Sequence, residues 1–126
     1  ESEIYAEMDS FGEFTSVDPS QLSFASQVAL FSSADIVIGA SGAAWANILF
    51  MRPGSHAVVI SDNTRSPWDT VAKMRGINLH LIVWDSWAWA PSRGRTERRI
   101  DPSKVLDCLN RILQDPAGTE GIANCI

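Results

Sequence analysis

One segment decides the fold of this chain: Ile36-Val-Ile-Gly-Ala-Ser-Gly-Ala-Ala-Trp-Ala-Asn-Ile-Leu-Phe-Met-Arg-Pro-Gly54. It begins as an apolar strand, turns through a corner of glycine and serine, and continues as a helix of small residues that we expect Ser41 to cap. The first backbone N–H groups of a helix have no partner inside it, and together with the helix dipole they favour a phosphate or another anion. The segment therefore predicts a strand–helix unit with an anion site at its corner.

Strand and helix patterns alternate along the chain on both sides of this segment. Strands are predicted at 14–17, 36–38, 56–60 and 79–84, and helices at 18–34, 41–51, 66–75 and from 101 onward. Unbroken apolar strands are typical of parallel sheets buried on both faces, and this alternation indicates right-handed crossovers. We therefore predict an α/β fold, a three-layer Rossmann-like sandwich with a mainly parallel sheet of about four to five strands. Residues 85–100 are predicted to form a long loop.

Length, charge and cysteine content narrow the class of protein. The 126 residues predict a single domain over 1–126, with 1–13 as an N-terminal tail or extra element and 115–126 as a C-terminal tail. The net charge of -5 disfavours nucleic-acid binding, which requires a basic surface. No apolar run reaches the ~18 residues of a membrane span, and the acidic N-terminus lacks the pattern of an export signal. We expect a reduced, cytoplasmic protein in which Cys108 is buried and no zinc is bound.

Candidate binding residues follow from the rule that ligands of open parallel sheets lie beyond the carboxyl ends of the strands. The spacing fits neither the dinucleotide fingerprint nor a P-loop. Two alternatives stay open for Asn47, a place on the solvent face or a buried hydrogen-bonding anchor. The residues after the third strand either contact a ribose or a pyrophosphate, or form a solvated turn. The predicted site residues are Gly39, Ser41, Gly42, Ala43, Asn47, Asp62 and Arg65.

The region after the fourth strand is rich in tryptophan and arginine. Alternating tryptophans can stack on sugars or bases, although packing or self-association is the interpretation we favour. The arginines that follow are expected to be solvated, and a nearby phosphate would suit them. Both histidines fall in strands, so we predict no general base, no catalytic triad, no metal and no cofactor. These residues are Trp84, Trp87, Trp89, Arg93, Arg95, Arg98, Arg99, His56 and His80.

The stretch from Phe24 and Gln27, through the apolar strand and the Gly-Ala-Ser-Gly-Ala corner, to Asn47 and Pro53-Gly54 resembles the C-terminal part of glycosyltransferase family 61. That family includes bacterial capsular polysaccharide enzymes and eukaryotic protein O-linked sugar transferases. The resemblance covers roughly residues 14 to 114. It implies the donor-binding half of a two-domain hexosyl- or pentosyltransferase, with a nucleotide-sugar at the corner and a role in polysaccharide biosynthesis.

Two departures from the family pattern define the alternative. Ser41 stands where the family usually has histidine, and Ala57-Val-Val-Ile60 stands where the family tends to carry a glutamate. Serine cannot replace imidazole as an acid, a base or a charged phosphate partner, so the catalytic residues are left unassigned. The alternative is a non-catalytic relative that acts as an interaction or oligomerisation module, a homodimer through an uncovered sheet edge. A weaker third reading is a small-molecule-binding protein unrelated to sugars.

Overall fold

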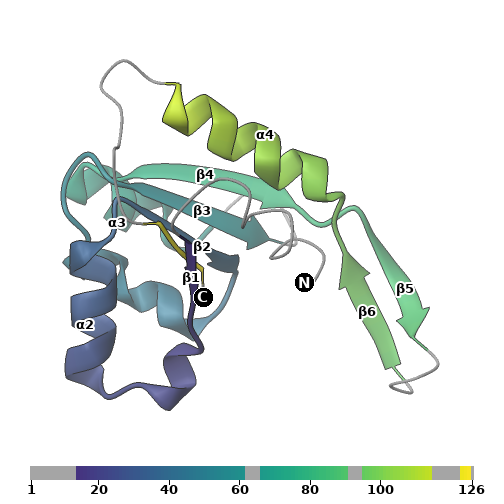
Figure 1. Cartoon of the computed structure of the whole chain (residues 1–126), viewed down its shortest axis with the longest axis horizontal. Coiled ribbons are helices and arrows are strands. Elements are labelled where there is room, and N and C mark those ends of the chain that lie inside the picture. Colours follow the sequence, from purple (N-terminus) through teal and green to yellow (C-terminus); the bar gives the residue numbers. More distant parts are fainter. Residues whose placement is uncertain (1–13, 62–65, 91–94, 115–122, 126) are drawn as a thin grey trace.

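A parallel sheet forms the centre of the molecule. The computed structural model describes residues 14–61, 66–90, 95–114 and 123–125 (Figure 1). The central strands are β2 (Ile36–Ala40), β3 (His56–Ser61) and β4 (Asn78–Val83), paired in parallel. Two short strands, β1 (Phe14–Ser16) and β7 (Ala123–Cys125), extend the sheet in the order β1-β7-β2-β3-β4. The α/β class and the parallel sheet are confirmed, whereas no sequence pattern predicted β7.

One face of the sheet is covered by α4 (Pro102–Leu113), as Figure 1 shows. Alternate strand residues, among them Ile38, Val58 and Ile82, pack against its apolar stripe. That stripe consists of Val105, Cys108, Leu109 and Ile112, all buried. Burial raises the pKa of the Cys108 thiol, so this cysteine behaves as a small apolar side chain, as predicted.

The opposite face is covered by α2 (Phe24–Ser33), η3 (Ala43–Phe50) and α3 (Asp69–Arg75). The intervening strand residues, such as Val37 and Val59, pack here against Phe31 and Trp45. The two aromatic rings meet edge to face, with their centroids 5.9 Å apart. Because β2 and β3 are buried on both sides, their sequences carry no polar alternation.

The helix predicted over 18–34 is two elements instead of one. Asp18 caps the 3-10 turn η2 (Pro19–Gln21), and the Ser23 side chain caps α2 by accepting a hydrogen bond from the Ser26 N–H. Between them, Leu22 and Ser23 are extended. Two capping side chains five residues apart therefore begin two elements, and the second cap overrides the helical pattern that runs through both.

The loop predicted over 85–100 is a hairpin of β5 (Ser86–Ala90) and β6 (Arg95–Arg99), paired antiparallel. Asp85 joins its two ends, since its carboxylate accepts a hydrogen bond from the Asp101 N–H (2.5 Å) and forms an ion pair with Lys104. The Lys104 hydrogen bond first, and the Asp101 backbone second, hold the pKa of the Asp85 carboxyl below its ordinary value. Asp101 also caps α4, so the hairpin is fastened to the start of that helix.

The Arg-Pro-Gly sequence after η3 closes the second strand–helix unit. Arg52 forms a 2.7 Å ion pair with Asp35, the residue before β2. Gly54 adopts a φ of 87°, which favours glycine, and its N–H donates to the carbonyl of Gly76 (2.8 Å). Gly76 itself ends α3 in the left-handed conformation, with a φ of 70°.

The two histidines lie together under α4. His56 on β3 and His80 on β4 are neighbours on one face, with His56 Nδ1 and His80 Nε2 3.1 Å apart and the rings stacked. Burial, then the proximity of His56 and of Arg111, lowers the pKa of His80. At the amino-terminal ends of their strands, both lie away from the carboxyl edge where ligands of such sheets bind.

This pair predicts a pH dependence of stability. Because the folded pKa of His80 is below its unfolded value of ~6.5, the unfolded chain binds more protons there, and the free energy of unfolding falls as the pH drops below ~6.5. Urea unfolding of the wild type and of His80→Gln between pH 5 and 8 measures this contribution. The variant should show the shallower pH dependence, and parallel curves would contradict the prediction.

Candidate functional site

The carboxyl ends of β2, β3 and β4 meet at one edge of the sheet. The Ser41 N–H donates to the carbonyl of Ile60 (2.8 Å), and the Trp84 N–H donates to that of Ser61 (3.1 Å). These two bonds continue the ladder one residue past the strands. The corner after β2 is thereby held against the end of β3, at the edge where ligands of open parallel sheets bind.

The helix after the corner begins differently from the prediction. η3 is a 3-10 helix whose N-cap is Gly42, in extended backbone and without a side-chain cap, so Ser41 does not cap it. The reason is that the Ser41 N–H is already bound to β3, which holds Ser41 in the sheet and moves the helix start by one residue. For the same reason the Ser41 N–H, which we expected to face a ligand, is occupied.

Three backbone donors remain at the corner. Ser41, Gly42 and Ala43 are exposed. Within the described part of the chain, the N–H groups of Gly42, Ala43 and Ala44 have no hydrogen-bond acceptor, since the first bond of η3 runs from the Trp45 N–H to the Gly42 carbonyl (3.1 Å). Free N–H groups at a helix start can bind an anion.

The remaining predicted residues have different positions. Gly39 is buried within β2, opposite Val59, and shapes the strand beneath the corner instead of facing solvent. Asp62 and Arg65 lie outside the described residues. Asn47, in contrast, lies on η3 and is 6% exposed, so of its two interpretations the buried anchor is the one observed.

Asn47 links η3 to α2. Its Nδ2 donates to Gln27 Oε1 (2.9 Å) and to the carbonyl of Ala44 (3.1 Å). The Gln27 amide in turn donates to the carbonyls of Pro19 (2.9 Å) and Leu22 (3.3 Å). The Gln27–Asn47 bond thus ties the first turn of η3 to the start of α2. The sequence signalled Gln27 only as part of the family motif.

Trp45 forms the floor of the corner. Its ring is fully buried, and its indole N–H donates to the carbonyl of Ala40 (3.0 Å). This bond satisfies the last carbonyl of β2 and fixes the angle between strand and helix. The ring fills the space below the corner and leaves the exposed side above Gly42 open, where a Cβ would meet nothing closer than 4.0 Å.

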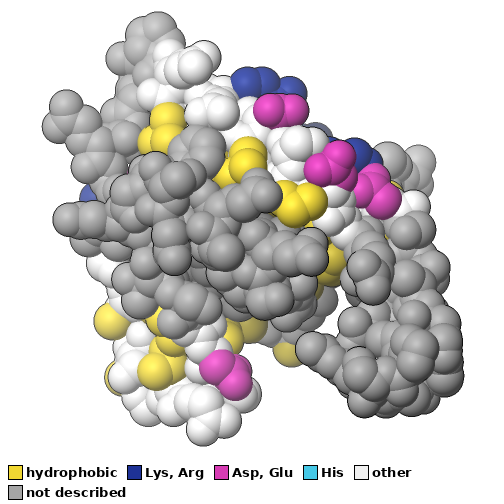
Figure 2. Space-filling model, turned by 45° about the vertical axis from the view of Figure 1, so that its right-hand side comes forward, with side chains coloured by type: hydrophobic (Ala, Val, Ile, Leu, Met, Phe, Trp, Pro, Cys, Tyr) yellow, Lys and Arg dark blue, Asp and Glu magenta, His cyan; other side chains and the backbone are white. Residues whose placement is uncertain are grey.

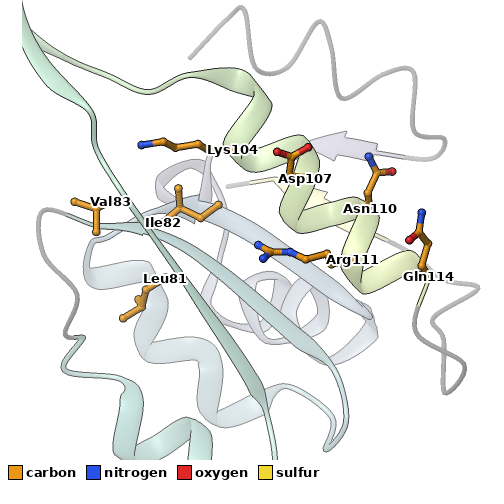
Figure 3. A pocket seen from close by; sticks show the side chains of 8 residues that line it. All are labelled: Leu81, Ile82, Val83, Lys104, Asp107, Asn110, Arg111 and Gln114. Atoms are coloured by element: carbon orange, nitrogen blue, oxygen red, sulfur yellow. The ribbon is translucent and has the colours of Figure 1, made fainter.

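A separate hollow of about 660 Å³ lies between β4 and α4 (Figure 3). Lys104 and Arg111 reach from α4 toward β4, whereas Asn110 and Gln114 point away from it. Acidic and basic side chains lie close together over α4 in Figure 2 as well. The hollow is open, and both acidic and basic side chains line it. Lys104 is already paired with Asp85. The hollow therefore has the character of a sheet edge and not of a ligand pocket.

The described residues contain no group of three or more histidine, cysteine, aspartate or glutamate side chains placed to hold a metal ion. Among the helices that the structure describes, none has both the length and the apolar character needed to cross a membrane.

The Gln27–Asn47 bond predicts a measurable coupling. Asn47→Ala leaves the half-buried Gln27 oxygen without its donor and should lower the free energy of unfolding by about 1–3 kcal/mol. Urea unfolding of the wild type, the two single variants Asn47→Ala and Gln27→Ala, and the double variant forms a double-mutant cycle. The cycle should give a coupling free energy of about 0.5–3 kcal/mol. In the control cycle, Ser26→Ala at an exposed position of α2 takes the place of Gln27→Ala. Its effect on the free energy of unfolding should be additive with that of Asn47→Ala. Additivity of the Gln27 pair itself would contradict the bond.

Comparison with known proteins relates part of the chain to a family. The family model described as Glycosyltransferase 61 matches residues 1–59, which include α2, β2, η3 and the start of β3. The comparisons with curated proteins and with solved structures gave no match. The match confirms the resemblance to glycosyltransferase family 61 over residues 1–59, which contain the motifs from Phe24 to Gly54.

Proposed function

We propose that the corner after β2 binds the diphosphate of a nucleotide-sugar donor. The observation that carries this proposal is the group of unpartnered N–H donors at Gly42, Ala43 and Ala44, of which Gly42 and Ala43 are exposed, at the carboxyl edge of a parallel sheet. The match of residues 1–59 to a glycosyltransferase family supplies the ligand class. Ser41 offers its exposed hydroxyl beside these donors, while Gly39 leaves β2 without a side chain under the corner.

The bonds around the corner support this proposal because they hold the donors in place before a ligand arrives. Asn47 fixes the first turn of η3 through Gln27, and Trp45 fixes the angle to β2. Preorganised N–H groups stabilise negative charge at little cost in reorganisation. As the bond from the sugar to the diphosphate breaks, that charge develops on the leaving nucleoside diphosphate, where these donors lie.

The proposal extends to the wider setting that the resemblance implies. Asp62 and Arg65 come directly after β3 in the sequence, and we assign them to the ribose and the diphosphate. The chain would act in the cytoplasm as the donor-binding half of a two-domain, Rossmann-like hexosyl- or pentosyltransferase of polysaccharide biosynthesis. The catalytic residues of such a transferase remain unassigned.

Calorimetry with uridine, guanosine and cytidine diphosphates tests the donor site. At least one should bind, and Gly42→Val should weaken it about tenfold, since the added side chain covers the N–H groups without clashing with the fold. Ala46→Val makes a comparable addition at an exposed position farther along η3 and should leave binding unchanged. If none of the three diphosphates binds, the ligand assignment is wrong.

A second candidate function, an association module, is favoured by the edge of the sheet. In the described strand order β4 has a neighbour on one side only. Its free edge lies beside the open hollow lined by Leu81, Val83 and α4 side chains (Figure 3). Such an edge pairs readily with a strand of another copy.

Light scattering from about 5 to 200 µM distinguishes the module from the donor-binding domain. A dimer through β4 should lose mass in Val83→Lys, which places a charge at the end of the edge strand and outside both core clusters. Met74→Lys, at an 81% exposed position on α3, should not affect it. A monomer at every concentration rejects the module.

A further inference from the structure

The β5–β6 hairpin is a described part of the molecule that the proposed donor site does not use. β5 and β6 form a sheet of their own. Figure 1 shows them projecting from the end of β4, beyond the sheet and its helices. The hairpin begins where β4 ends, so it starts at the same sheet edge as the corner at Gly42.

The composition of the two strands is unusual. β5 reads Ser86-Trp-Ala-Trp-Ala90 and β6 reads Arg95-Thr-Glu-Arg-Arg99, without a single leucine, isoleucine, valine, methionine or phenylalanine. Three arginines against one glutamate give the strands a net charge of +2, in a chain whose net charge is -5. An excess of positive charge together with two tryptophans indicates an anionic partner with a face for stacking.

The register places the aromatic and cationic residues on one face. Trp87 stands opposite Arg98, and Trp89 stands opposite Thr96. Because directly opposed residues and alternate residues of a strand share a face, these four positions belong to the same side of the hairpin. The other side carries the small residues of β5 opposite Arg95, Glu97 and Arg99.

We propose that the Trp87–Trp89 face binds an acidic oligosaccharide, a chain of sugars that carries carboxylates. The partly positive C–H groups of a sugar pack on the negative face of an indole ring, and a guanidinium binds a carboxylate through two parallel hydrogen bonds. The register places Trp87 and Arg98 at directly opposed positions, so one residue of each kind belongs to this face. The carboxylate-bearing sugar complements the positive charge of the strands.

The same register argues against an anionic membrane as the partner. Membrane-surface elements separate an apolar face from a cationic one and use leucine and phenylalanine to enter the acyl region. Here Arg98 shares the tryptophan face, and the strands hold no large aliphatic side chain. The face can stack on a ring and pair with a charge, but it offers little apolar area for insertion.

The root of the hairpin is fastened so that such a face is held in position. Asp85 accepts from the Asp101 N–H and pairs with Lys104, which joins the residue before β5 to the residue after β6 and to α4. A binding surface on a fixed arm loses less entropy on binding than one on a free loop. The role of the bound sugar, as acceptor or product of transfer, rests on the proposed function. The binding itself can be measured whether or not the protein transfers a sugar.

Fluorescence anisotropy of a labelled tetragalacturonate tests the proposal on the whole chain. We expect saturable binding, weakened about tenfold or more by Trp87→Ala and by Arg98→Ala, and largely restored in Trp87→Phe. Lys73→Ala removes an equal charge at an exposed position of α3 and should leave binding unchanged. Circular dichroism of each variant verifies that it is folded.

Three further arms complete the test. A neutral cello-tetraose that binds as well as the uronate overturns the role of Arg98, and tighter binding to phosphatidylglycerol vesicles overturns the choice of a sugar. A self-association that Trp87→Ala abolishes, with no uronate binding, also overturns the proposal. Loss of uronate binding in the hairpin variants with nucleoside diphosphate binding retained supports it. If the diphosphates fail to bind but the uronate binds, the proposed function falls and this inference stands.

Discussion

The parallel pairing of β2 with β3 is the constraint on which the rest of the structure depends. Both strands are buried on both faces, so α4 packs against one side of this pair, and α2, η3 and α3 pack against the other. The pairing continues one bond beyond the strands, from Ser41 to Ile60. That additional bond decides where η3 begins and which backbone donors are left at the corner.

The corner shows how a family motif acts mainly through positions that do not face a ligand. Gln27, Asn47 and Trp45 are engaged in bonds that join α2, η3 and β2, and Arg52 ties the far end of η3 to Asp35. These side chains support the proposed donor site without having to contact the donor. They determine the position of three N–H groups, and a short element of eight residues could not hold those groups in place alone.

The sequence predicted the α/β class, the three central strands and the last helix, because apolar periodicity and capping residues act locally. It missed the division at Leu22, where the Ser23 cap outweighs a helical pattern, and it missed the hairpin, whose small and charged residues lack an apolar repeat. β7 could not be predicted, since a three-residue strand depends on partners remote in sequence.

At the site, exposure of Gly42 and Ala43 follows from the corner motif. The occupied Ser41 N–H and the Gln27–Asn47 bond depend on tertiary contacts that no local pattern encodes.

Asp101 has two roles, because its side chain caps α4 while its backbone N–H is held by Asp85. The protruding arm and the helix that seals one side of the core therefore share an anchor. Fraying of the first turn of α4 would therefore loosen the root of the hairpin as well.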